Sequence, residues 1–586
     1  MRTEKLLTLS TTLVAMVLLA GMFSATTAQV LPKQKFPAPA AKFSNAVAFD
    51  VSLPLRDLAA ARKNAAPAFP EEREIRPERG EVASNSKYSG DKALQTGGLR
   101  PSGPFAIPSP SLTFEGLSNQ DNFETFGFRV APPDPVGDVG PNHYVEMINL
   151  VFAVYDKTGH RLLGPVDTGT LWANFAVPDC TDPSGDPVVL YDQFSDRWLL
   201  SQFTTRGPIY YNCVAISQTG DPTGSYFRYA FSAGPFFPDY PKYGVWKKSY
   251  LLTSRDFGNE GEYGISAYAL ERAKMLAGKP NARVVHFFLD SAVVPLNLIG
   301  DGLLPADIDG TRLPTGTAPA PLVGTQDDDI PYGATVDALN IWDLFIEWKQ
   351  TPIASITFRG SFETAPFDSN FPCGVVAGSQ PPSARDCLPE PGVTDGSRFL
   401  DILSYRQRPT WRLAYRKFGN AGGYESMVTN QSVEALPGIG GVRWYEIRRV
   451  NGDYSIYQQG TFAPDDGVHR WMGSIAQDQA GNLGLGYSVV NGFDVFPGIR
   501  YTGRLKGDTL GEMTLGEGTI INGSGVQVTV NSRWGDYTSM NVDPTDDCTF
   551  WYVNEYYELS GVIGVNTVPF QTRIGSFRLP GCGGVR

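Results

Sequence analysis

SRWGDYTSMNVDPTDDCTFWYVNEYY, residues 532–557, is the segment that says most about the fold. It begins with Arg533 and Trp534, passes through an acidic turn and ends in a dense aromatic run. Asp543 and Asp547 stand at the two ends of the turn. Asp at a turn can accept backbone N–H groups, and Asp or Asn tolerates the left-handed backbone of a hairpin corner. The segment therefore predicts two antiparallel strands joined by a tight turn.

The same order of strand, acidic turn and strand occurs twice more. VLYDQFSDRWLLSQF carries it with Asp192 and Asp196, and SIAQDQAGNLGLGYS carries it with Asp478 and Asn482. Arg-Trp also precedes the second of these copies, in HRWMGSIAQD. Such repetition indicates a β-propeller, because its four-stranded blades pack on their neighbours and leave few free edges.

The composition agrees with an all-β protein. Among 586 residues there are 63 Gly and 45 Pro, while 12% are aromatic and 19% are charged, which suits short strands and tight turns. Only LERAKMLAG, 270–278, has a helical pattern. We expect a β-propeller of seven blades, within a range of six to eight at about 40–60 residues each. A pair of β-sandwich domains is the alternative.

Changes in composition divide the chain into parts. Residues 1–28 are interpreted as a signal peptide. Residues 29–115 are rich in Pro and Ala and lack a sustained apolar period, so we expect a disordered or extended leader, or linker, there. The propeller is expected over 116–586, with a Pro-rich insertion near 370–395.

The N-terminus and the charge limit where the protein acts. Arg2 and Lys5 precede the apolar run LVAMVLLAGMF, and small residues allow cleavage after Ala28. An uncleaved membrane anchor is the alternative. No later apolar run could serve as a transmembrane anchor, so we expect a secreted, periplasmic or extracellular protein. The net charge of −12 without a basic stripe argues against a nucleic-acid partner.

The cysteine pattern fits export. An even number of cysteines in an exported chain favours disulfides, and six of them allow fifteen pairings. Sequential pairing is preferred because it closes three short loops. Zinc is the rival interpretation, but there is no CxxC spacing and there are only 4 His residues. The six cysteines are Cys180, Cys213, Cys373, Cys387, Cys548 and Cys582.

Several longer blocks resemble a known family. They include DPVGDVGPNHYVEMINLVFAVYDKTG, GDPVVLYDQFSDRWLLSQF, WRLAYRKFGNAGGYESMVTNQSV, GVRWYEIRR, GIRYTGR and SRWGDYTSM. Together these blocks, spread over most of 130–557, resemble large secreted bacterial β-propeller proteins, a family without a settled activity. The resemblance implies a bacterial, extracytoplasmic propeller, and we expect a monomer.

A more distant likeness is to sialidases, whose propellers carry turn motifs of the form S-x-D-x-G-x-x-W. The nearest stretch here, 476–483, has Asp478 but lacks the Ser, the correctly spaced Gly and the Trp. No sialidase residue is therefore carried over by motif.

Arginine next to an aromatic residue is frequent in the C-terminal third. If the strands they begin are inner strands of successive blades, their guanidinium groups could converge on one channel face and bind an anionic sugar. Alternatively, each Arg pairs with a local acid and fastens adjacent blades. The candidate substrate-binding residues are Arg443, Arg470, Arg500, Tyr501, Arg533 and Trp534, together with His143 at a strand start.

Carboxylates near these arginines are candidates for catalysis. Glycoside hydrolysis usually needs two, one as acid and one as base or nucleophile. Sialidase-type chemistry would instead pair a Tyr nucleophile with a Glu, although adjacent strand residues point to opposite faces. The candidate catalytic residues are Glu425, Tyr445, Glu446 and Asp536.

TQDDDIPYG contains the one acidic run considered for a metal. Asp327, Asp328 and Asp329 could bind structural calcium through clustered oxygens, although the EF-hand pattern is absent. A solvated acidic loop is the alternative. No cofactor is expected to be required.

Two functions fit these observations. One is a carbohydrate-active hydrolase or lyase acting on extracellular, anionic glycans. The other is a non-enzymatic propeller that binds glycans or a surface protein. A hydrolase predicts at least two carboxylates facing a group of arginines, whereas a binding protein predicts exposed aromatic residues on a face or rim.

Overall fold

The computed structural model describes residues 30–31, 34–61, 88, 90–328, 332–369, 386–402, 408–420, 423–528, 533–560 and 569–583. The predicted signal peptide, Cys373 and Asp329 lie outside these residues. The described chain is nearly all β, built from antiparallel sheets, and the prediction of an all-β propeller is confirmed. The short helix Arg272–Leu276 (α3) forms inside the one segment with a helical pattern.

Within the described residues, most strands belong to seven antiparallel units of four, some of which are joined or extended by further strands. The expected number of propeller blades stays a prediction. Each unit is called a blade below, and its strands are numbered first to fourth in the order in which they pair. The first three blades consist of β5 (Val136–Val139), β6 (His143–Ile148), β7 (Val151–Asp156) and β8 (Arg161–Asp167); of β9 (Val188–Asp192), β10 (Arg197–Phe203), β11 (Tyr210–Ser217) and β12 (Tyr226–Gly234); and of β13 (Phe237–Val245), β14 (Ser249–Phe257), β15 (Tyr263–Glu271) and β16 (Arg283–Asp290).

The next three blades follow in chain order. They consist of β17 (Leu304–Ile308), β18 (Ala320–Gln326), β19 (Ala338–Glu347) and β20 (Ile353–Glu363); of β23 (Thr410–Phe418), β24 (Tyr424–Leu436), β25 (Ile439–Val450) and β26 (Asp453–Phe462); and of β27 (His469–Gln477), β28 (Leu483–Val490), β29 (Gly498–Arg504) and β30 (Glu517–Ile521). The seventh consists of β31 (Ser539–Val542), β32 (Thr549–Tyr557), β33 (Phe570–Arg578) and β4 (Leu112–Ser118).

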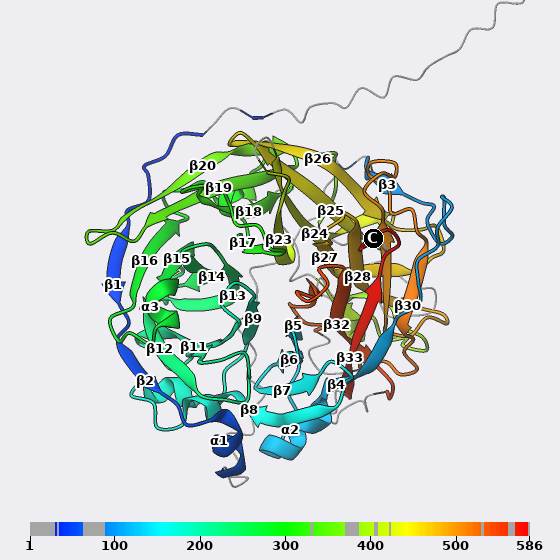
Figure 1. Ribbon diagram of the computed structural model, residues 1–586. Coiled ribbons are helices and arrows are strands. Elements are labelled where there is room, and N and C mark those ends of the chain that lie inside the picture. Colours follow the sequence, from blue (N-terminus) through cyan, green and yellow to red (C-terminus); the bar gives the residue numbers. More distant parts are fainter. Residues whose placement is uncertain are drawn as a thin grey trace, which may run out of the picture.

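The blades are arranged radially, and the first strands that the figure labels lie nearest the centre (Figure 1). Two neighbouring first strands, β17 and β23, also pair directly and run parallel to each other. Two terms describe the ends of each first strand. The leading end is where the chain enters the blade, and the hairpin end is where the chain turns into the second strand. The chain between the fourth and fifth blades contains a small sheet of β21 (Asp386–Leu388) and β22 (Leu400–Asp401), in the region of the expected insertion.

The segment expected to be a disordered leader differs from that expectation where it is described. Three of its strands pair with the fourth strands of blades, and a further one is itself the fourth strand of the seventh blade. The figure shows the first two following the outside of the ring (Figure 1). Because each strand pairs on one side only and is short, it needs no alternating apolar pattern. The pairs are β1 (Lys42–Asn45) with β16, β2 (Ala48–Val51) with β12, β3 (Leu94–Gln95) with β26, and β4 with β33.

Other short elements connect the blades. None of the helices in the described residues is long and apolar enough to cross a membrane. These elements are the α-helices α1 (Leu55–Ala61), α2 (Asn119–Phe126) and α4 (Leu296–Ile299) and the 3-10 helices η1 (Thr168–Trp172), η2 (Pro178–Thr181) and η4 (Gly396–Arg398).

The repeated acidic turns connect first and second strands of three blades, as the sequence predicts. Asp478 accepts the backbone N–H groups of Ala480 and Asn482, each at 2.9 Å. Asp196 and Asp547 have φ of 52° and 55°, the left-handed backbone that Asp tolerates. The repeat is therefore a structural device of the hairpin end.

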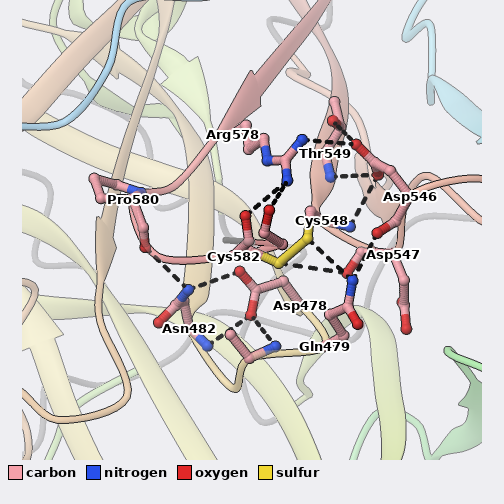
Figure 2. Close-up of a disulfide and its surroundings, with 12 residues drawn as sticks. Asp478, Gln479, Asn482, Asp546, Asp547, Cys548, Thr549, Arg578, Pro580 and Cys582 are labelled. Atoms are coloured by element: carbon pink, nitrogen blue, oxygen red, sulfur yellow. Dashed lines mark hydrogen bonds and ion pairs between the residues drawn. A yellow bond between two sulfur atoms is a disulfide. The ribbon is translucent and has the colours of Figure 1, made fainter. Parts of the chain in front are cut away.

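Two of the three disulfides predicted by sequential pairing are present, Cys180–Cys213 and Cys548–Cys582. The second lies beside the acidic turns of the last two blades (Figure 2). There the Gln479 side chain donates to the carbonyl oxygen of Asp546 at 2.8 Å, and Arg578 donates to the carbonyl oxygen of Cys582 at 2.7 Å. This disulfide therefore fastens the C-terminal segment to two blades at the hairpin end.

Candidate functional site

Polar side chains from several blades meet at the leading end. Asp134 precedes β5, Asp186 precedes β9 and Asp536 precedes β31, so each enters the centre immediately before a first strand. Asn149 links two of them: its Nδ2 donates to Asp134 Oδ2 at 2.7 Å, and its Oδ1 accepts the Asp186 backbone N–H at 2.8 Å. Asp134 Oδ1 accepts the Asp536 backbone N–H at 2.6 Å. The three carboxylates therefore belong to one network, called the leading-end cluster below.

Asp536 lies between two arginines. Arg408 Nη2 lies 3.2 Å from its Oδ1, and Arg533 Nη2 lies 2.8 Å from its Oδ2. All three side chains are buried. Two guanidinium groups next to one carboxylate favour its ionised form. Asp536 is therefore the carboxylate of this cluster with the strongest cationic environment shown.

Asp186 has a different environment. Its Oδ2 accepts the Tyr537 hydroxyl at 3.2 Å, while its Oδ1 has no hydrogen-bond partner within the described residues. Burial raises the pKa of Asp186 well above its usual value, and the neighbouring Asp239, Asp134 and Asp536 raise it further. Burial also raises the pKa of Asp134 to about 6. Two carboxyls of the cluster thus have raised pKa values.

Lys242 is the other chemically unusual group of the cluster. It follows a register shift in β13 after Asp239, and its Nζ lies 3.1 Å from the ring centroid of Tyr240 and 3.2 Å from that of Tyr537. The side chain is 1% exposed, and its Nζ has no hydrogen-bond partner in the described part of the chain. Burial lowers the pKa of Lys242 well below its usual value. An amine with a lowered pKa can act as a general base.

Further carboxyls lie next to this network. Burial raises the pKa values of Glu555 and Glu390 well above their usual range, and each contributes to the environment of Tyr557. Gly535 lies close to both Asp134 and Glu555, since a Cβ built on it would be 3.0 Å and 3.2 Å from their oxygens. A larger residue than glycine would therefore disturb the cluster at this point.

The four predicted arginines lie in different places. Arg470 lies on a first strand, and Arg533 precedes one, but Arg443 and Arg500 lie on third strands, so the condition for convergence is not met for these two. Arg443 is fully buried and bonds Asp91 at 3.0 Å, in the segment before β3. Arg470 and Arg500 share Glu517, at 2.8 Å and 2.9 Å. These contacts tie strands together, and only Arg533 belongs to the leading-end cluster.

The other predicted binding residues are also held by packing. Trp534 is buried, donates from Nε1 to Ser488 at 3.1 Å and packs edge-on against Trp471. Tyr501 donates its hydroxyl to the carbonyl oxygen of Pro108 and stacks on Phe577. His143 is half-buried at the start of β6, on the hairpin end, and burial lowers its pKa.

The remaining catalytic candidates lie in the fifth blade. Tyr445 accepts a hydrogen bond from Gln431 at 3.0 Å, and burial raises its pKa. Glu446 accepts from Gln458 at 2.6 Å and from Arg448 at 2.7 Å. Because their contacts differ, the structure does not bring Tyr445 and Glu446 together as a nucleophile and its base.

Glu425 is in the same blade but lines an open cavity. It forms an ion pair with Arg449, and the cavity wall is shared with the fourth blade. Among the predicted catalytic candidates, only Asp536 joins the leading-end cluster.

Two of the predicted calcium residues, Asp327 and Asp328, form part of an acidic group. Ligand oxygens of Asp327, Asp328 and Asp337 lie within 4.8 Å of one another. Ser369 already donates its backbone N–H to Asp327 at 2.7 Å, and Phe367 donates its own to Asp337 at 2.7 Å. Burial and then Asp327 raise the pKa of Asp337 to about 8.

The sequence contained a signal for the residues that were missed. Asp134 and Asp186 both stand in the order Asp-Pro-Val at the start of a first strand, with φ of 50° and 52°. Asp239 and Asp536 both precede a tyrosine at a similar place. The repetition of these two short patterns points to the leading end, whereas Lys242 and Arg408 have no comparable marker.

Solved structures with a similar outline include several carbohydrate-active enzymes. The GH93 α-L-arabinofuranosidase of Fusarium graminearum, complexed with arabinobiose, is 10% identical with a TM-score of 0.30, covering 67% of this chain and 93% of its own. The α-L-arabinanase of Penicillium chrysogenum, complexed with arabinobiose, is 10% identical with a TM-score of 0.30, covering 65% and 90%. The polysaccharide lyase Uly1 is 8% identical with a TM-score of 0.28, covering 82% and 100%.

Neither a family model nor a curated protein matches the chain. Because the sequence identities and TM-scores of these similar structures are low, no residue role and no activity is inferred from them for this protein.

Proposed function

We propose that this protein is a carbohydrate-active enzyme that cleaves glycosidic bonds in extracellular glycans, with its active site in the leading-end cluster. The observation that carries the proposal is the contrast between Asp186 and Asp536. Asp186 is buried among other carboxyl groups, whereas Asp536 lies between two guanidinium groups. A buried carboxyl with a raised pKa beside a carboxylate held by two cations is typical of an acid–base pair.

The contrast assigns a role to each group. Glycoside hydrolysis needs an acid that gives a proton to the leaving oxygen and a carboxylate that acts as base or nucleophile. Asp186, with its raised pKa, is the proposed acid. Asp536 is the proposed base or nucleophile, and Arg408 and Arg533 hold it in position.

Elimination by a lyase is the second candidate, because Lys242 is a buried amine with a lowered pKa. A base removes the proton on the carbon next to a sugar carboxylate, the bond to the leaving oxygen breaks, and a carbon–carbon double bond forms. Lys242 would take that proton, and Tyr537 would give one to the leaving oxygen. Only an anionic glycan offers such a carbon.

A screen of the purified protein on neutral and acidic polysaccharides tests the proposal. Product release with new reducing ends and no double bond supports hydrolysis, while ultraviolet absorbance from an unsaturated product supports elimination. Binding without turnover of any glycan contradicts both and favours the alternative, a non-enzymatic propeller that binds glycans or a surface protein.

The cellular place and the assembly state remain proposals as well. We propose a secreted monomer, and the disulfides Cys180–Cys213 and Cys548–Cys582 support export because such bonds persist in oxidising compartments. Fractionation of expressing cells, followed by size-exclusion chromatography with light scattering, tests both statements.

Structural calcium at Asp327 and Asp328 stays a prediction, and we propose Asp337 as a further ligand. If calcium binds there, adding it to chelator-treated protein raises the melting temperature, since a ligand that binds only the folded state stabilises it. Asp328→Asn should reduce this rise. An unchanged melting temperature with calcium contradicts the prediction.

A further inference from the structure

A cavity lined by several charged side chains lies between the fourth and fifth blades. It has a volume of about 640 Å³, within the range of small-molecule sites. Its wall includes the connection from β17 to β18, the turns after β23 and β25, and side chains of β19, β20, β24 and β25. These turns belong to the hairpin end, so the cavity is distinct from the leading-end cluster.

Arg449 provides the innermost cation of this cavity. Its Nε bonds Glu425, and its Nη1 donates to the Tyr454 hydroxyl at 2.9 Å and to the Pro319 carbonyl oxygen at 3.0 Å. The side chain is 4% exposed, and its Nη2 has no hydrogen-bond partner in the described residues. A buried guanidinium with an unused donor favours an additional acceptor.

Two further cations stand nearer the opening. Arg359 is 34% exposed and lies 3.2 Å from Asp343, and Lys417 bonds the hydroxyl of Thr315. The wall thus carries three cations, Arg359, Lys417 and Arg449, against two carboxyls. The cavity therefore favours an anionic guest.

The uncharged lining fits hydroxyl groups. Asn420 and Asn451 offer amide donors and acceptors, and Thr315 offers a hydroxyl. Such a mixture of amides, carboxyls and cations recognises a ligand that has several hydroxyls and one negative group.

We propose that this cavity binds a sugar acid, a hydroxylated ligand with one carboxylate. Arg449, Arg359 and Lys417 bind the carboxylate, and the amide side chains contact the hydroxyls. The proposal does not depend on catalysis at the leading end. It gives the protein a second place to hold an acidic glycan.

Ligand-observed NMR titration of the full chain with glucuronate, and with glucose as the neutral match, tests the proposal. Glucuronate should bind more tightly than glucose. Lys417→Ala and Arg359→Gln should each weaken glucuronate binding about 10–100-fold, since bonds to charged groups are strong. Equal affinity for the two sugars, or affinity unchanged in both variants, overturns the proposal.

Two control variants make the result specific. Lys349→Ala removes an exposed cation whose partner is Glu347 and which does not line the cavity, so it should leave glucuronate affinity unchanged. Asp186→Asn should retain glucuronate binding at the cavity even where it abolishes glycan cleavage. If Asp186→Asn loses glucuronate binding, the sugar acid binds at the leading end and not in the cavity. This result overturns the proposed cavity site but leaves the proposed function standing.

Discussion

Aspartates occupy both ends of the first strands, but their surroundings differ. At the hairpin end, both Asp478 oxygens accept hydrogen bonds from the turn, from Ala480 and Asn482 on one side and from the Asn482 side chain on the other. At the leading end, Asp186 has one oxygen without a partner in the described residues and several carboxyls around it.

This difference separates two uses of one residue type. A carboxylate whose oxygens are taken by its own turn stabilises local structure. A buried carboxyl with an unused oxygen and like charges nearby costs stability, and such groups concentrate at functional sites. The leading end is therefore the more informative place to look for chemistry.

The largest expected effect comes from comparing two single variants, in each of which one Asp is replaced by Asn. One variant is at the leading end and the other is at the hairpin end. Asp186→Asn should lower glycan cleavage about 10²–10⁴-fold, because an amide cannot give the proton, while the fold is kept by the similar shape. Asp478→Asn should leave cleavage unchanged. Initial rates of product release, with circular dichroism on both variants, measure the difference. Equal rates in the two variants would break the proposed division between the ends.

Removing the disulfide at the hairpin end should have a large effect on stability alone. Cys548 and Cys582 are 34 residues apart, and a loop of this length contributes about 3–4 kcal/mol in the chain-entropy account. The double variant Cys548→Ala/Cys582→Ala should therefore unfold at lower denaturant and keep its activity when folded. A loss of activity in the folded state would link the hairpin end to catalysis.

A single turn at the hairpin end should matter less. Asp543 accepts hydrogen bonds from the backbone and hydroxyl of Thr545 and from Trp551 Nε1 at 3.1 Å. Asp543→Ala leaves the buried indole N–H unpaired, which should cost about 1–3 kcal/mol. Chemical denaturation measures this cost. Asp453→Ala, at an exposed position at the start of β26, is the control and should cost little.

The last expected effect is a pH dependence, and it concerns a carboxyl that lies at neither end. Burial raises the pKa of Glu146 on β6 to about 7. Because its folded-state pKa is raised above the unfolded value, its contribution is present below about pH 4 and is lost as pH rises through about 7. Between about pH 4 and pH 7 the free energy of unfolding should therefore fall as pH rises. In Glu146→Gln the slope of this fall should be smaller by the amount that corresponds to roughly one proton. Parallel slopes in variant and parent would contradict this.

Local signals in the sequence predicted the hairpin end well. Asp192, Asp478 and Asp543 each accept a hydrogen bond from a backbone N–H two or four residues later, so a turn pattern is sufficient to identify them. The same holds for the pair Arg533 and Asp536, which share one loop.

The leading end could not be predicted in the same way. Asp134 and Asp536 are 402 residues apart, and their contact exists only because the ring closes. Lys242 is notable for its burial between Tyr240 and Tyr537, and burial is a property of the assembled blades. The predicted Arg443 and Arg500 failed to converge because they lie on third strands, a position that an Arg-aromatic pair does not reveal.

The pairing of β4 with β33 has a consequence for how the protein is made. The strand that closes the seventh blade is synthesised early, and its partner, residues 570–578, comes more than four hundred residues later. Contacts this distant along the chain slow folding, and an unpaired strand can associate with other chains in the meantime. Ring closure is therefore expected to be a late step of folding, and the yield of native protein should depend on how long residues 112–118 wait for their partner.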